Sequence, residues 1–148
     1  MTWEYIAGFF DGEGSITYNG KGYRISIAQT NKEVFDTIMA SISCGMIFEV
    51  KKRQEHWKQS WVYYIAKQED VLQFLEKCYP HLIVKKPLAR KTIKELCVSI
   101  KAAKARRALR AERIKRATIL RNNGFTYRAI GKRLHIDFGY ARQLILAK

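Results

Sequence analysis

The first hundred residues alternate between two kinds of hydrophobic spacing. Residues 2–11 and 69–78 carry apolar side chains at intervals of three and four, which is the spacing of an amphipathic helix, and a third such stretch begins at Asn31. Between them, residues 15–27 and 46–66 alternate polar with apolar positions around short turn sequences, as β-hairpins do. The expected order is αββαββα, an α+β fold with an antiparallel sheet.

Glycine and asparagine mark the expected ends of these elements. The first helix should stop at residues 12–14 (GEG), because a glycine past the last turn is a common helix end. The turn at 19–22 (NGKG) joins the first hairpin, and Gly45 ends the helix that begins at Asn31. In the second hairpin, the alternation places Trp61 and Tyr63 on one face.

From Pro87 onward the chain is expected to be mostly helical. Residues 101–113 are rich in alanine and arginine, which are good helix formers, and we interpret them as a basic helical linker. Thr126 and Asp137 are candidate N-caps. Three short helices are expected at 114–122, 126–134 and 137–147. The expected domains are a core at 1–100, the linker at 101–113 and a small module at 114–148.

Charge is distributed unevenly along the chain. The sequence holds 28 Lys+Arg against 13 Asp+Glu, a formal net charge of +15. Residues 1–100 contribute only +3, whereas residues 101–148 carry 14 basic side chains against Glu112 and Asp137. Such an excess usually indicates a polyanionic partner. We expect nucleic acid rather than a membrane surface, because an amphipathic anchor would not need the turn signals of the C-terminal module.

The sequence predicts an intracellular protein, in the cytoplasm, the nucleoid or an organelle matrix, that is not secreted. Its apolar runs are far shorter than a bilayer span, and its first residues lack the basic start and apolar stretch of a signal peptide. Cys44, Cys78 and Cys97 are far apart and odd in number, which fits a disulfide framework badly. A reducing compartment is therefore expected.

The first helix combines two features with physical consequences. Gly8 and Gly12 are four residues apart, so they share a helix face on which another backbone can approach closely, with Ala7 beside them. Each glycine costs about 1 kcal/mol relative to alanine, which suggests that close packing is gained in return. Asp11 and Glu13 come at the C-terminal end, where the macrodipole disfavours negative charge. A positive group is therefore expected there.

Packing of this helix against its own copy would bring two Glu13 carboxylates together. Like charges that close cannot both ionise unless a cation neutralises them. A divalent metal with oxygen ligands meets this requirement. Because the sequence holds one stretch of this kind, such a site requires a homodimer.

Residues 6–14 (IAGFFDGEG) resemble the nine-residue motif of the LAGLIDADG homing endonuclease family. The αββαββα order extends the resemblance over residues 2–100. The resemblance implies a site-specific double-strand DNA endonuclease that acts in intron homing. It also implies Mg²⁺ or Mn²⁺ as the cofactor, and a homodimer on a long pseudo-palindromic site.

The resemblance assigns roles to individual residues. Glu13 binds the catalytic metal, the Gly12 carbonyl assists, and Asp11 is more structural. Gln29, at the end of the second strand, orders active-site water, with Asn31 as its rival. A family lysine follows the third core helix, where Lys85 and Lys86 lie, and we prefer Lys85. The dimer interface is expected at Ala7, Gly8, Asp11 and Gly12.

The resemblance also implies that DNA is recognised by the outward face of the sheet, whose side chains would reach base edges in the major groove. Base-by-base assignment does not follow from the sequence. The residues with suitable parity or loop placement are Arg24, Ser26, Lys51 and Arg53.

The C-terminal module resembles the helix-turn-helix of recombinases and repressors. Gly139, near the start of the expected recognition helix, departs from that pattern. The expected core residues of the module are Ile119, Leu120, Ile130, Leu134, Ile136, Ala141, Leu144 and Ile145. Those left to face DNA are Thr126, Tyr127, Arg128, Phe138, Tyr140, Arg142 and Gln143. The alternative is a helical appendage for dimerisation or stability.

Two other functions remain open at this point. A catalytically silent DNA-binding regulator of the same fold would not need Glu13. The other is an intron RNA maturase, whose partner would be intron RNA. The basic charge does not distinguish the two, because a basic surface suits either nucleic acid.

Overall fold

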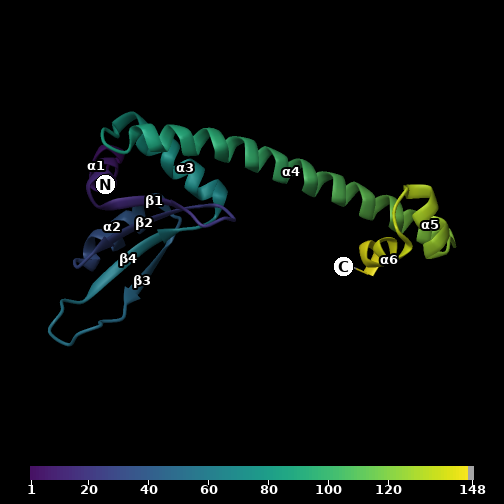
Figure 1. Ribbon diagram of the computed structural model, residues 1–148, viewed down its shortest axis with the longest axis horizontal. Helices are drawn as coiled ribbons and strands as arrows, with labels where there is room; N and C mark the ends of the chain where they lie inside the picture. The colour runs from purple at the N-terminus through teal and green to yellow at the C-terminus, as the bar shows by residue number, and fades with distance from the viewer. Residues whose placement is uncertain (147–148) are drawn as a thin grey trace. The chain divides into compact units, whose positions relative to one another are not determined.

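The computed structural model describes residues 1–146 of the chain (Figure 1). The first elements are α1 (Trp3–Glu13), β1 (Gly14–Tyr18), β2 (Tyr23–Gln29), α2 (Lys32–Ile42), β3 (Met46–Val50), β4 (Ser60–Ile65) and α3 (Gln68–Cys78). After them come a 3-10 helix η1 (Tyr79–His81), α4 (Lys86–Asn122), α5 (Tyr127–Leu134) and α6 (Phe138–Leu146). The α+β class and the αββαββα order are confirmed. Ala147, the expected end of the last helix, lies outside the described residues.

The four strands form one antiparallel sheet in the order β1-β2-β4-β3 (Figure 1). The Asn19 side chain closes the first hairpin, because its Oδ1 accepts hydrogen bonds from the backbone N–H groups of Lys21 and Gly22. Ile27 of β2 pairs with Tyr63 of β4, which in turn pairs with Ile47 of β3. This register puts alternate residues of neighbouring strands on the same face.

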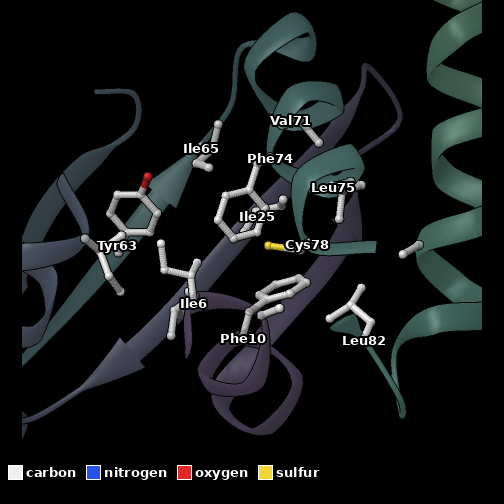
Figure 2. Close-up of a cluster of buried hydrophobic side chains, with 14 of the residues drawn as sticks. Ile6, Phe10, Ile25, Tyr63, Ile65, Val71, Phe74, Leu75, Cys78 and Leu82 are labelled. Carbon is white, nitrogen blue, oxygen red and sulfur yellow. The ribbon is translucent and has the colours of Figure 1, made fainter. Parts of the chain in front are cut away.

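One face of the sheet packs against α1, α2 and α3 and forms the main core. Phe10 of α1 and Phe74 of α3 meet edge to face, with ring centroids 5.1 Å apart, and both are buried. Figure 2 shows the two rings together with the strand residues Ile25, Tyr63 and Ile65 in one cluster. The inward side chains are Ile25, Ile27, Tyr63 and Ile65.

Trp61 and Tyr63 share a face of β4, and it is the face that meets the helices. Tyr63 is fully buried and donates its hydroxyl to the carbonyl of Cys44 at 2.6 Å. Trp61 is partly buried and packs against the same core. Neither ring is therefore on the outward face that the sequence analysis considered for DNA.

Helix α4 is longer than expected, with 37 residues. The short helix expected at 114–122 is not separate, because α4 continues through the expected linker to Asn122. The reason is local, since no glycine or proline occurs between Pro87 and Gly124. No described helix combines the length and the apolarity that a membrane span requires.

The chain forms two compact units, residues 1–100 and the part from Lys101 onward. The buried core of the second unit contains Ala117, Ile130, Ala141 and Leu144. The expected core residue Ile119 is instead 51% exposed. The helical repeat explains why Ile119 is exposed. Ala117 and Leu120 lie on the inward face of α4, and Ile119 is turned away from that face.

The expected N-caps of the second unit are both present. Thr126 accepts a hydrogen bond from the N–H of Ala129 at 3.3 Å, which begins α5. The Asp137 carboxylate accepts one from the N–H of Gly139 at 2.7 Å, which begins α6. A Cβ at Gly139 would lie 2.9 Å from that carboxylate oxygen. The unexpected glycine therefore leaves room for the cap.

Phe10→Ala should destabilise the first unit by about 3–5 kcal/mol, because it removes a fully buried ring and leaves a cavity. Phe48→Ala, at a residue that is 48% exposed, is the control and should cost less than about 1 kcal/mol. Urea unfolding followed by circular dichroism measures both. Equal losses would contradict the assignment of Phe10 to the core.

Candidate functional site

Helix α1 presents an open face that contains Gly8 and Gly12. Both glycines are exposed, and a Cβ built at either one meets nothing within 4 Å. Tyr5 lies on the same helix and is 54% exposed. Ala7, in contrast, is fully buried in the core of its own chain, so its side chain is not available at this face. The open face can thus admit a second backbone at the two glycines.

The Asp11 carboxylate is held by the loop before α4. Its Oδ2 accepts hydrogen bonds from the N–H groups of Ile83 and Val84, each at 2.8 Å. Its Oδ1 accepts one from the N–H of Lys85 at 2.7 Å. Burial of the carboxyl group opposes ionisation, but these three donors outweigh it, and the pKa of Asp11 is lowered from its usual value. Asp11 therefore acts within its own chain, as a structural anchor.

Lys85 supplies the positive charge that the acidic helix end led us to expect. Its Nζ donates a hydrogen bond to the main-chain carbonyl of Asp11 and lies 5.9 Å from the centre of the Phe10 ring. The ammonium group is thus at the C-terminal end of α1, where the helix dipole is negative. Lys86 is directed elsewhere, with its Nζ 3.4 Å from the carbonyl of Pro80. Of the two lysines considered, Lys85 is the one beside α1.

Glu13 is the last residue of α1 and is exposed. The Gly12 carbonyl and the Glu13 carboxylate offer oxygen donors of the kind that Mg²⁺ and Mn²⁺ prefer. Among residues 1–146, no group of three or more His, Cys, Asp or Glu side chains could hold a metal ion. The residues therefore fit a divalent metal in kind, but one chain supplies only part of a ligand set.

Gln29 lies at the same end of the sheet as Glu13. Gly14, where β1 begins, pairs with Ile27 near the end of the antiparallel strand β2. The Oε1 atom of Gln29 accepts a hydrogen bond from the N–H of Thr30 at 2.8 Å. Its rival Asn31 is the N-cap of α2 and accepts from the N–H of Glu33 at 3.0 Å. Both side-chain oxygens accept a backbone hydrogen bond within the chain, and Asn31 is exposed whereas Gln29 is half-buried, so both residues stay candidates for contact with substrate.

The DNA-binding candidates of the first unit lie on the outward face of the sheet or in the loop after β3. The Arg24 guanidinium lies 5.7 Å from the centre of the Tyr64 ring. The hydroxyl oxygen of Ser26 lies 2.8 Å from that of Ser15, within hydrogen-bond distance. The loop candidates, both exposed, are Lys51 and Arg53.

The candidates of the second unit differ in how far they are engaged by neighbours. Arg121 lies over the Tyr127 ring, with 4.6 Å between its guanidinium carbon and the ring centre. Arg128 is exposed and lies 5.9 Å from the centre of the Phe138 ring. On α6, Tyr140 is half-buried, whereas Arg142 and Gln143 are exposed. Arg142 and Gln143 on α6 are therefore two adjacent candidates that are both exposed.

Two features of the site were missed by the sequence analysis. The backbone donors of residues 83–85 left no signal, because every residue except proline supplies an N–H group. A depression at the start of α2 is lined in part by Lys32, Lys58 and Trp61. The charged composition of the loop that contains Lys58 was visible, but its approach to α2 depends on the fold.

A family comparison matches residues 3–95 with the family described as the WhiA LAGLIDADG-like domain. This match covers more than half of the chain. No curated protein matches the sequence.

Solved structures of homing endonucleases show the same fold. The archaeal intron-encoded homing endonuclease I-Vdi141I, complexed with DNA, is 26% identical, with a TM-score of 0.52 over 67% of this chain and 69% of that one. I-CvuI, in complex with its target in the presence of Ca²⁺, is 19% identical, with a TM-score of 0.50 over 64% of each chain. The meganuclease I-AabMI, bound to uncleaved DNA, is 14% identical, with a TM-score of 0.50 over 80% of this chain and 44% of that one. The chain thus spans less than two thirds of the length of several of the structures that it matches.

Asp11→Asn should destabilise the first unit by about 1–2 kcal/mol, the low end for charge-assisted hydrogen bonds, because the carboxylate is partly solvated. The exposed residue Asp36 provides the control, Asp36→Asn, which should change little. Urea unfolding at several pH values measures the effect.

The lowered pKa of Asp11 determines how its contribution to the free energy of unfolding changes with pH. A carboxyl group with a lowered pKa in the folded state stabilises the protein above its unfolded pKa of about 3.9 and loses this effect as pH falls through the folded value. The difference between wild type and Asp11→Asn should therefore persist at about pH 6 and shrink below about pH 4. A stability difference between wild type and Asp11→Asn that grows as pH falls would contradict the role of Asp11 as a structural anchor.

Proposed function

We propose that this chain, which belongs to the WhiA LAGLIDADG-like domain family, is a DNA endonuclease that acts as a homodimer with a divalent metal. Its substrate in this proposal is double-stranded DNA with a long, pseudo-palindromic site, and its metal is Mg²⁺ or Mn²⁺. Intron homing would be the biological setting of such an enzyme.

The observation that carries this proposal is the placement of Glu13 at the end of an open glycine face. The carboxylate is exposed rather than used within the chain, whereas Asp11 of the same motif is held by three backbone donors. An exposed acid beside an interface suits a ligand that is shared between two chains. The likeness of the fold to DNA-bound homing endonucleases supports the same reading.

In the proposed reaction, the residues that would hold the metal are Glu13 and, through its carbonyl, Gly12 of each protomer. When bound, a divalent metal supplies an activated water and positive charge for the leaving oxygen. Lys85 keeps the end of α1 in place through its hydrogen bond to Asp11 and adds positive charge where negative charge develops. The amide group of Gln29 would orient water at the end of β2.

The dimer is proposed to form through the α1 faces of two copies, at Gly8 and Gly12. A twofold axis there would bring the two Glu13 residues together and give each protomer one half of the DNA site. Ala7 and Asp11 are left out of the proposed side-chain contacts, because one is buried and the other is bound to its own loop.

The second unit is proposed to add DNA affinity as a helix-turn-helix. In this proposal, residues 101–113 form the basic linker, residues 114–148 form the module, and α6 is the recognition helix. The exposed Arg142 and Gln143 on α6, with the capped start of that helix, support this assignment.

A second candidate is a catalytically silent DNA-binding protein. The family match is to a LAGLIDADG-like domain and its description does not name a nuclease, which favours this candidate. It makes the same contacts with DNA but no use of Glu13 in catalysis, so cleavage separates the two candidates.

Gly8→Leu should abolish the homodimer and leave the monomer folded. A side chain there meets nothing within 4 Å inside the chain, but it would fill the space that a second helix needs. Loss of a helical glycine should also raise the stability of the monomer by up to about 1 kcal/mol. Sedimentation equilibrium measures the association. Ala40→Leu, at an exposed position of α2, is the matched control and should still dimerise.

Glu13→Gln should retain DNA binding and lose cleavage. Duplexes are first selected from a random library by the wild type in Ca²⁺, and the selected pool is then transferred to Mg²⁺. Wild type should cut the pool, and Glu13→Gln should bind it with similar affinity but cut at least about 100-fold more slowly, as expected when a metal ligand is removed. Tight, selective binding without cutting by wild type would establish the silent candidate.

Arg142→Ala is the complementary variant, because it changes the second unit alone. It should weaken binding but leave the cleavage rate unchanged at saturating protein. Loss of cleavage at saturation would contradict the proposed division of labour between the two units.

A further inference from the structure

The outward face of the sheet is apolar on one half and polar on the other. On β1 and β2 it carries Ser15, Thr17, Ser26 and Arg24, which pair across the two strands. On β3 and β4 the pairs on this face are Met46 with Tyr64, Phe48 with Val62, and Val50 with Ser60. We call Met46, Phe48, Val50, Val62 and Tyr64 the apolar strip.

The β3 members of the apolar strip are exposed within the first unit, and its β4 members Val62 and Tyr64 are half-buried. Met46 is 55%, Phe48 48% and Val50 39% exposed. Phe48 and Tyr64 meet edge to face, with ring centroids 6.0 Å apart, so the strip has a defined shape. Large apolar side chains in a row on the open face of a sheet usually mark a surface that binds a partner.

We propose that the apolar strip contacts the C5-methyl groups of thymine in the major groove, so that the half-site beneath β3 and β4 is rich in A·T pairs. This inference rests on the proposed DNA-binding function. The major groove admits a two-stranded β-ribbon, and apolar side chains there distinguish thymine by its methyl group. The ribbon of β3 and β4 presents such side chains in alternate positions.

The charges around the strip favour DNA over a protein partner. Arg24 lies over Tyr64 at one end of the strip, and β3 runs directly into the basic residues Lys51, Lys52 and Arg53. Apolar contacts in the middle with cations at the margins match a groove floor that is flanked by phosphates. The polar half on β1 and β2 would instead read base edges through hydrogen bonds.

The test removes methyl groups one at a time from the DNA. A duplex selected by the wild type in Ca²⁺ is resynthesised with deoxyuridine in place of thymidine at single positions, and affinity is measured by fluorescence anisotropy. At a cluster of positions in each half-site, each lost methyl should weaken binding about three- to fourfold, the factor for one buried methyl group. Methylation of cytosine at C5 in the same cluster should leave affinity unchanged or raise it.

Phe48→Ser should bind the thymine and uracil duplexes equally at one of those positions. Leu88→Ser, at a residue on α4 that is 44% exposed, is the matched control and should keep the full difference. Val50→Ser provides a second variant of the strip, and circular dichroism checks that each variant is folded.

Equal affinity of wild type for thymine and uracil duplexes at every position overturns the methyl contact while DNA binding stands. Failure to select or bind any duplex overturns the proposed function itself. Stronger competition by single-stranded RNA than by the duplex would assign the strip to stacking with unpaired bases instead.

Discussion

The Asp11 carboxylate, bound by the N–H groups of Ile83, Val84 and Lys85, is the interaction on which the rest of the site depends. It joins the end of α1 to a loop that lies 72–74 residues further along the chain. The same loop brings the Lys85 ammonium to the helix end. Because these contacts lie within one chain, the end of α1, where Glu13 lies, is fixed by the chain itself.

Helix α1 can keep an open glycine face because its other face is deeply buried. Ile6 and Phe10 are almost wholly enclosed by the core and contribute about 1.5–3 kcal/mol each. Gly8 and Gly12 cost about 0.5–1 kcal/mol each relative to alanine. Burial of these two side chains therefore outweighs the cost of the two glycines. The sheet divides its two faces in the same way, with the core on one side and the apolar strip on the other.

Local patterns were sufficient to predict the hairpins, the αββαββα order and the caps at Thr126 and Asp137. Contacts between distant segments were not predictable, and the backbone donors to Asp11 are the clearest case, because a main-chain group does not change when residues are substituted. The alternation in β4 predicted that Trp61 and Tyr63 share a face but not which face is buried. The length of α4 could be predicted from the absence of glycine and proline after Pro87, but the sequence analysis divided this helix into a linker and a separate short helix.

The strand β3 is at an edge of the sheet and carries the exposed side chains of Met46 and Phe48. Exposed apolar edge strands promote aggregation in many proteins. The net charge of +15 opposes this, because free chains repel one another at low ionic strength. The lysines and arginines thus favour the solubility of the free chain. In the proposed complex, DNA would neutralise this charge and cover the apolar strip in the same step.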